Sequence, residues 1–113
     1  MAPATGAINW NTVLQQALAA AEGVLGQKWQ GVSQGAISQI RLLTNTAEYI
    51  AENKDNMRPV EAKAVVANQS LALQNVLLIY EDIGIATAEQ VVQAVWTVIG
   101  GALQTAAGVA IKV

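Results

Sequence analysis

The sequence predicts an all-α protein with a central helical hairpin, a charged hairpin tip, and apolar N- and C-terminal helices on either side. Apolar residues recur every three or four positions along most of the 113 residues, which is the spacing of one helix face. Alternating apolar and polar runs are absent, and the β-branched residues fall at helical spacing, so strands are not supported. We therefore expect one helical unit, 1–113, in three parts: an N-terminal arm 1–32, a hairpin 33–83 and a C-terminal helix 87–113.

The composition predicts that the chain assembles with a partner rather than existing as a soluble monomer. The chain is 53% hydrophobic and only 12% charged, about half the charged fraction usual in soluble domains. A large apolar surface should therefore be covered by copies of the chain, by other partners or by lipid. The net charge of -2 gives no basic footprint, so sequence-specific nucleic-acid binding is not expected.

The residue types also argue against a catalytic or metal-binding site. The chain has no Cys and no His, which removes thiolate metal sites and the commonest general base. The acidic pairs Glu81–Asp82 and Glu48/Glu52 have no catalytic partner near them in sequence, so we interpret them as solvated surface. No catalytic, cofactor-binding or metal site is predicted, and the chain is not expected to be an enzyme.

The N-terminal arm should contain a helix that begins near Asn9 to Thr12, where Asn or Thr can cap free amides. Its apolar face would be Trp10, Leu14, Ala17, Ala21 and Leu25. Four glycines follow, Gly23, Gly26, Gly31 and Gly35, and they predict a break, a kink or a tight helix crossing. Two readings stay open at this point: residues 10–53 form one kinked helix or two separate helices.

The first arm of the hairpin, 33–53, is an amphipathic pattern with a polar and an apolar stripe. The polar stripe is Gln34, Ser38, Arg41, Asn45, Glu48 and Glu52, and the apolar stripe is Ile37, Ile40, Leu43, Ala47 and Ile50. Residues 53–56 are turn-forming types, and Pro59 suits the first position of the next helix. Half of the chain's six basic and eight acidic residues lie within 48–63, which predicts a water-exposed hairpin tip.

The return arm, 59–83, becomes too apolar in its second half to lie alone on a surface. Its leucines are Leu71, Leu73, Leu77 and Leu78. We expect this half to be sandwiched between helices. Gly84 is predicted to end the arm in a left-handed conformation, and Thr87 to cap the last helix in a capping box with Gln90.

The C-terminal helix carries no charge from Gln90 to Ile111 and sorts into two kinds of face. A narrow polar or very small strip, expected to line a lumen or the seams between copies, is Gln90, Gln93, Thr97, Gly100, Gln104 and Gly108. An apolar row, expected to face lipid or neighbouring helices, includes Val92, Trp96, Ile99 and Leu103. The four-residue spacing of Gly100, Gln104 and Gly108 favours close approach of a neighbouring helix backbone.

The same helix must be weighed as a membrane span. Twenty-two helical residues reach about 33 Å, close to the roughly 30 Å of bilayer hydrocarbon. Against insertion of a single copy, Gln93, Thr97 and Gln104 are polar, and Trp96 lies in the middle rather than at an interface. A helix buried in protein, or inserted as an oligomer, fits this pattern better.

The run from Asn45 to Leu103 resembles short helical virion or membrane-active proteins of tailed bacteriophages. The shared features are a small chain without Cys or His, an Ala/Gln/Gly-rich apolar arm and a charged hairpin turn. The resemblance implies a virion protein that assembles into an envelope-crossing channel during genome delivery, with itself, other virion proteins and the host membrane as candidate partners. Holins, small phage proteins that perforate the inner membrane, share these sequence features. They usually end in a basic tail, however, whereas in this chain only Lys112 follows the last apolar stretch.

Two classes of function follow for testing. The first is a non-enzymatic structural protein that forms a homo-oligomeric helical tube, ring or membrane-crossing channel in a phage virion, with a holin-like perforating protein as a variant. The second is a soluble, cytoplasmic helical-bundle module whose apolar arms pack into one closed bundle or into a partner's groove.

Overall fold

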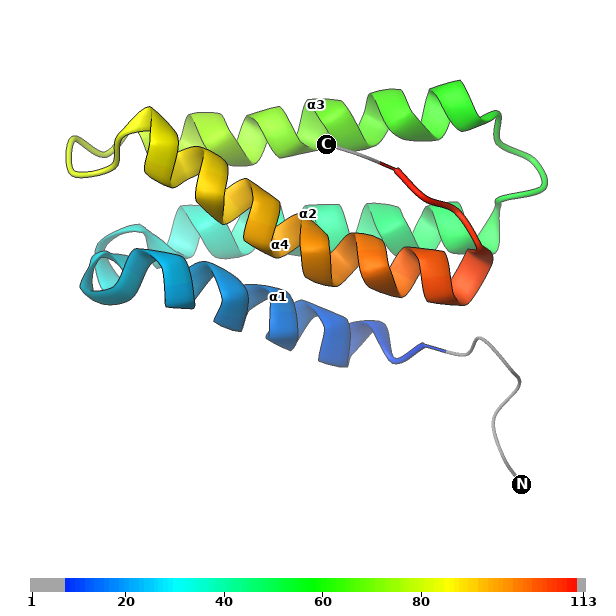
Figure 1. The fold of residues 1–113 in the computed structure, drawn as a ribbon, viewed down its shortest axis with the longest axis horizontal. Helices are drawn as coiled ribbons and strands as arrows, with labels where there is room; N and C mark the ends of the chain where they lie inside the picture. The colour runs from blue at the N-terminus through cyan, green and yellow to red at the C-terminus, as the bar shows by residue number, and fades with distance from the viewer. Residues whose placement is uncertain (1–7, 112–113) are drawn as a thin grey trace.

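Four α-helices that run alternately up and down make up residues 8–111, the part of the chain described in a computed structural model (Figure 1). They are α1 (Trp10–Leu25), α2 (Trp29–Glu52), α3 (Pro59–Leu78) and α4 (Ile85–Ala107). A short 3-10 helix, η1 (Gly26–Lys28), joins the first two. No strand occurs among these residues, so the all-α prediction is confirmed, and α2 and α3 are the arms of the predicted hairpin.

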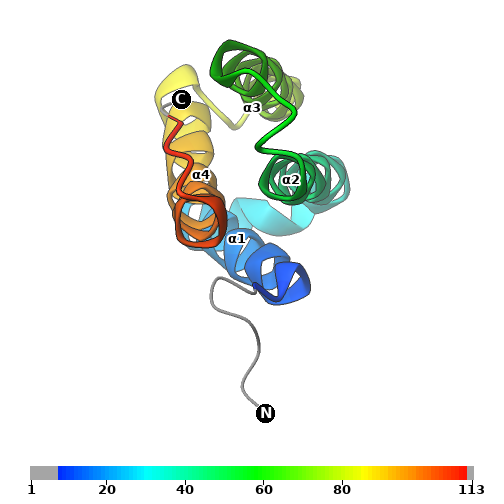
Figure 2. The same cartoon turned by 90° about the vertical axis from the view of Figure 1, so that its right-hand side faces the viewer.

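The helices are not equally enclosed. α2 and α4 each pack against the three other helices, whereas α1 contacts only α2 and α4, and α3 likewise contacts only α2 and α4. Viewed end-on, α1 and α3 lie at opposite edges of the bundle (Figure 2). The edge position of α3 leaves more of its circumference uncovered, which matters for the site described below.

One continuous apolar core fills the space between the helices. Its largest fully buried side chains are Ile40, Leu43, Ile50, Leu73, Leu77, Ile99, Leu103, Val66, Val91 and Val95. Each of the helices α2, α3 and α4 contributes to this set, while α1 adds Val13, Leu14, Ala17, Ala21 and Leu25. The three-four spacing in the sequence therefore marks the faces that meet in the core.

The first half of the chain forms two helices, which resolves the alternative that the sequence leaves open. Asn9 caps α1, because its Oδ1 accepts hydrogen bonds from the backbone N–H groups of Asn11 and Thr12 at 3.0 and 3.2 Å. Gly26 ends α1 with φ +57°, a left-handed value that favours glycine. At Gly35, an added Cβ would lie 2.9 Å from the Val76 Cγ1, so this glycine permits a close α2–α3 crossing.

The hairpin tip carries exposed charges, as predicted from the sequence. Lys54, Asp55 and Arg58 are all exposed in the turn between α2 and α3. Pro59 occupies the first position of α3, and the Glu61 carboxylate accepts a hydrogen bond from the Arg58 backbone N–H at 2.9 Å.

The predicted junction between the last two helices is wrong in its details. α3 already ends at Leu78, and Gly84 has φ -83°, so it is not a left-handed stop; it is the N-cap of α4. Thr87 lies inside the first turn of α4 rather than at its cap. Two long-range contacts hold the loop between them: Ile83 is buried in the core, and the Lys28 ammonium donates a hydrogen bond to the Asp82 carbonyl oxygen at 2.7 Å.

α4 also ends earlier than the sequence suggests. Gly108 adopts φ +69° and its N–H bonds to the Gln104 carbonyl oxygen, a left-handed cap that ends the helix at Ala107. The chain then folds back from the end of α4 (Figure 1). Lys112, and with it the tail feature compared with holins, lies outside the described residues.

Candidate interaction surface

The apolar row of α4 is covered by the chain's own helices. Ile99 and Leu103 are fully buried, and Val92 and Trp96 are 6% and 7% exposed. Because α4 packs against α1, α2 and α3, these side chains face neighbouring helices within one chain. The other helices of the same chain therefore cover this apolar row, and a second copy is not needed to bury it.

The polar strip of α4 lies on the outer surface. Gln90, Gln93, Thr97, Gln104 and Gly108 are exposed, and Gly100 is half-buried. The Thr97 hydroxyl donates to the Gln93 carbonyl oxygen of the preceding turn at 2.8 Å. The strip therefore lies at the surface of the bundle rather than in its core.

The glycines of the strip have local roles. A Cβ at Gly100 would lie 2.7 Å from Trp96 Nε1 and 2.8 Å from Trp96 Cε2, so Gly100 makes room for an indole of its own helix. Gly108 is the helix cap, and Gly101 has no atom within 4 Å of an added Cβ. The close approach of another helix backbone to Gly100 and Gly108 therefore stays a prediction about contacts between copies of the chain.

The indole of Trp96 also fixes the segment after α4. Its Nε1–H donates a hydrogen bond to the Ile111 carbonyl oxygen at 2.7 Å. Val109 and Ile111 are half-buried and pack against the core. The absence of a side chain at Gly100 thus leaves space for the Trp96 indole. In that position the indole hydrogen-bonds to Ile111 and fixes the segment that follows α4.

α3 carries several exposed apolar side chains on its outer surface. Val60 is 65% exposed, Val65 38% and Leu71 54%, and Ile79, just past the helix end, is 76% exposed. The prediction that the leucines of this arm are sandwiched between helices holds for Leu73 and Leu77 but not for Leu71. Other exposed large hydrophobic residues are Leu42 and Tyr49 on α2 and Ile85 at the start of α4, but α3 carries more of them than either of these helices.

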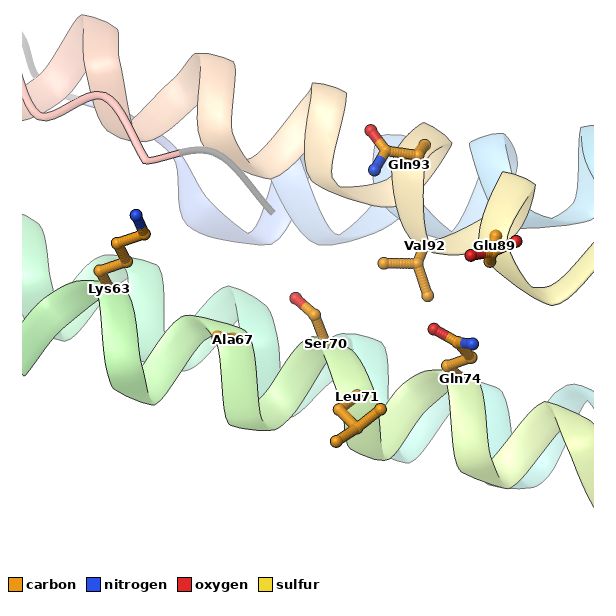
Figure 3. Close-up of a pocket in the computed structure, with 8 residues that line it drawn as sticks. All are labelled: Lys63, Ala67, Ser70, Leu71, Gln74, Glu89, Val92 and Gln93. Atoms are coloured by element: carbon orange, nitrogen blue, oxygen red, sulfur yellow. The ribbon is translucent and has the colours of Figure 1, made fainter. Parts of the chain in front are cut away.

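Beside this surface, α3 and α4 enclose a groove with a volume of about 500 Å³ (Figure 3). It is lined by Lys63, Ala67, Ser70, Leu71, Gln74, Glu89, Val92 and Gln93. The groove is open because α3 presents the small side chains of Ala67 and Ser70 toward α4, where larger residues would fill the space.

The floor of the groove contains a polar group without a partner. Ser70 is only 3% exposed, and its Oγ has no hydrogen-bond partner among the described residues. In Figure 3 its hydroxyl points into the space between the two helices. Leaving a buried hydroxyl unpaired costs about 1–3 kcal/mol, so a partner atom that enters the groove would be favoured.

The described residues hold no constellation for metal chemistry. Among residues 8–111, no three His, Cys, Asp or Glu side chains lie together in a way that could bind a metal ion. Glu81 and Asp82 are exposed in the loop before α4, and Glu52 is exposed at the end of α2.

None of the described helices is both long and apolar enough to cross a membrane.

Sequence reasoning placed the candidate surface on α4 and missed the groove beside α3. The available signal was the spread of apolar residues around the whole circumference of α3, where Val60, Val65 and Leu71 lie off the core face of Val66 and Leu73. That spread predicts an additional neighbour, but the groove itself depends on how α3 and α4 diverge in space.

Comparison with known proteins does not assign the chain to a family: no protein-family model matches it, and no similar curated protein or solved structure is found.

Proposed function

We propose that this chain is a non-enzymatic structural protein that assembles with copies of itself through the outer surface of α3. The observation that carries the proposal is the exposure of Val60, Val65 and Leu71 on one edge helix of a chain that is only 12% charged. Burying such side chains against another protein surface is favourable by about 25 cal/mol per Å² of apolar area.

A ring or tube needs more than this one surface. A contact related by a two-fold axis closes on itself as a dimer, so a larger assembly requires a second contact. The exposed polar strip of α4, with Gln90, Thr97 and Gln104, is the candidate for that seam. The proposed assembly does not cross a membrane through α4, because Val92, Trp96 and Ile99 are buried inside the bundle rather than facing outward. The virion setting implied by the sequence resemblance stays a prediction.

The test is the mass of the purified chain in detergent-free buffer over a range of concentrations, by light scattering after gel filtration. We expect a multiple of the 11.8 kDa chain mass. Leu71→Ser should weaken the association, whereas Leu42→Ser, at a leucine of α2 with 45% exposure, is the matched control and should not. Equal losses in the two variants would argue against α3 as the surface.

A second candidate function is a helical-bundle module that binds a different protein. The burial of the whole apolar row of α4 within one chain favours it, since the bundle closes without copies. A mass of 11.8 kDa at every concentration would support this second function over the first.

A further inference from the structure

The groove between α3 and α4 carries opposite charges at its two ends. Lys63 lies at one end and Glu89 at the other, with Ala67 and Ser70 between them (Figure 3). Gln74, which lies near Glu89, is eleven residues after Lys63, so the groove is about 16 Å long along α3.

Neither charge is paired within the part of the chain that the structure describes. The ion pair found among the described residues joins Arg58 to Glu61 at 3.6 Å, and neither Lys63 nor Glu89 has a hydrogen-bond or ion-pair partner there. Both side chains are exposed. An occupant of the groove therefore meets a free ammonium at one end and a free carboxylate at the other.

A surface with this arrangement is complementary to itself. We propose that the α3–α4 groove is a two-fold interface between two copies of this chain, an inference that rests on the self-assembly proposed above. A two-fold axis that crosses the groove midway between Lys63 and Glu89 puts the lysine of each copy against the glutamate of the other. The two ends of the interface then carry one attractive pair each.

The middle of the groove fits the same arrangement. Leu71 is 54% exposed at its edge, and the cavity beside Ala67 and Val92 offers an apolar place for the Leu71 side chain of the second copy. Ser70 lies closer to the two-fold axis than to either charged end of the groove, so its Oγ, buried and unpartnered in one chain, falls in the middle of the interface.

Charge reversal tests the arrangement on the full-length chain by sedimentation velocity at low ionic strength. Lys63→Glu makes both ends of the groove acidic, and Glu89→Lys makes both ends basic, so each variant alone places like charges together twice per dimer. We expect the dimer Kd to rise about tenfold or more in each case. An equimolar mixture of the two variants restores both attractive pairs, and it should dimerise about as tightly as the original chain.

Two further variants serve as controls. Arg41→Glu on α2 and Glu22→Lys on α1 make the same charge changes at exposed positions that do not line the groove, and they should leave the Kd unchanged. Circular dichroism melts show whether each variant is folded. The differences between variants should shrink at about 0.5 M salt, because the pairs are exposed.

The outcomes separate the two proposals. If the original chain is oligomeric but the reversals have no effect, or the mixture fails to recover, the groove is not the interface while self-assembly stands. A monomer at all concentrations overturns both. A monomer that carries a co-purified small molecule in native mass spectrometry also overturns the inference and assigns the groove to that ligand.

Discussion

α3 and α4 are both apolar over most of their surface, yet the fold treats them differently. α4 packs against three helices, and its row of Val91, Val95, Ile99 and Leu103 is fully buried. α3 packs against two helices and leaves Leu71 half exposed. The chain thus covers this row of α4, a helix with one charged residue, whereas α3, with two charged residues, leaves apolar side chains exposed along its length.

This difference teaches that the need for a partner is set by position in the bundle more than by composition. A helix in the middle of a bundle can be apolar on most sides because neighbours surround it. A helix at the edge exposes whatever its outer face carries. The self-assembly proposal therefore moves from α4, where the sequence pointed, to α3 and the groove beside it.

The largest expected effect is in the enclosed helix. Leu103→Ala removes most of a side chain that is 0% exposed and leaves a cavity in the core. The free energy of unfolding should fall by about 2.7–5 kcal/mol. Urea denaturation followed by circular dichroism measures it. A loss below about 1 kcal/mol would mean that α4 is not enclosed as described.

The next effect separates two adjacent glycines of α4. Gly100→Ala forces a Cβ to within 2.7 Å of the Trp96 indole, whereas Gly101→Ala meets nothing within 4 Å. Both gain helix propensity, but only the first overpacks, so Gly100→Ala should be less stable than Gly101→Ala by about 1–3 kcal/mol. Thermal melts of the two variants give the comparison. The reverse order would contradict the packing of Trp96 against its own helix.

A smaller effect concerns the chain after α4. Trp96→Phe keeps an aromatic ring in the core but loses the hydrogen bond to the Ile111 carbonyl oxygen. Stability should fall by about 1 kcal/mol, and amide hydrogen exchange should accelerate around Val109 and Ile111 more than in α1. Unchanged exchange in that segment would show that the bond does not hold it.

The smallest effect is expected on the outer surface of α3. Leu71→Ala should change the stability of the folded monomer by less than about 0.5 kcal/mol, because the side chain is 54% exposed. Leu73→Ala, two positions later in the same helix and 0% exposed, should cost about 2–5 kcal/mol. Denaturation at concentrations low enough to prevent association makes the comparison. Similar losses at both positions would mean that Leu71 is covered within the chain.

The sequence predicted the helices and most of their core faces because those depend on spacing within about a dozen residues. The cap at Asn9, the start at Pro59 and a break near Gly26 depend on local backbone preferences, and they are found where such residues stand. The end of α3 at Leu78 escaped prediction because Ile83 and the Lys28–Asp82 hydrogen bond, both long-range, shape that loop.

The groove could not be predicted for a similar reason. Lys63 and Glu89 lie 26 positions apart in the sequence, and no periodicity relates them. Their shared location depends on the antiparallel packing of α3 and α4 and on the small side chains of Ala67 and Ser70. The exposure of Leu71 depends equally on the absence of contact between α3 and α1.

The pairing of α1 with α4 is more extensive than that of any other two helices, although α2 and α3 separate them along the chain. During synthesis on the ribosome, α2 and α3 are made before α4. Val13 and Leu14 on α1 therefore stay without the contacts of α4 until both of these helices have been synthesised. Burial of the apolar face of α1 against α4 is therefore a late step in folding, because it joins segments that are far apart in the sequence. Chaperones that shield apolar helices would have their greatest opportunity in that interval.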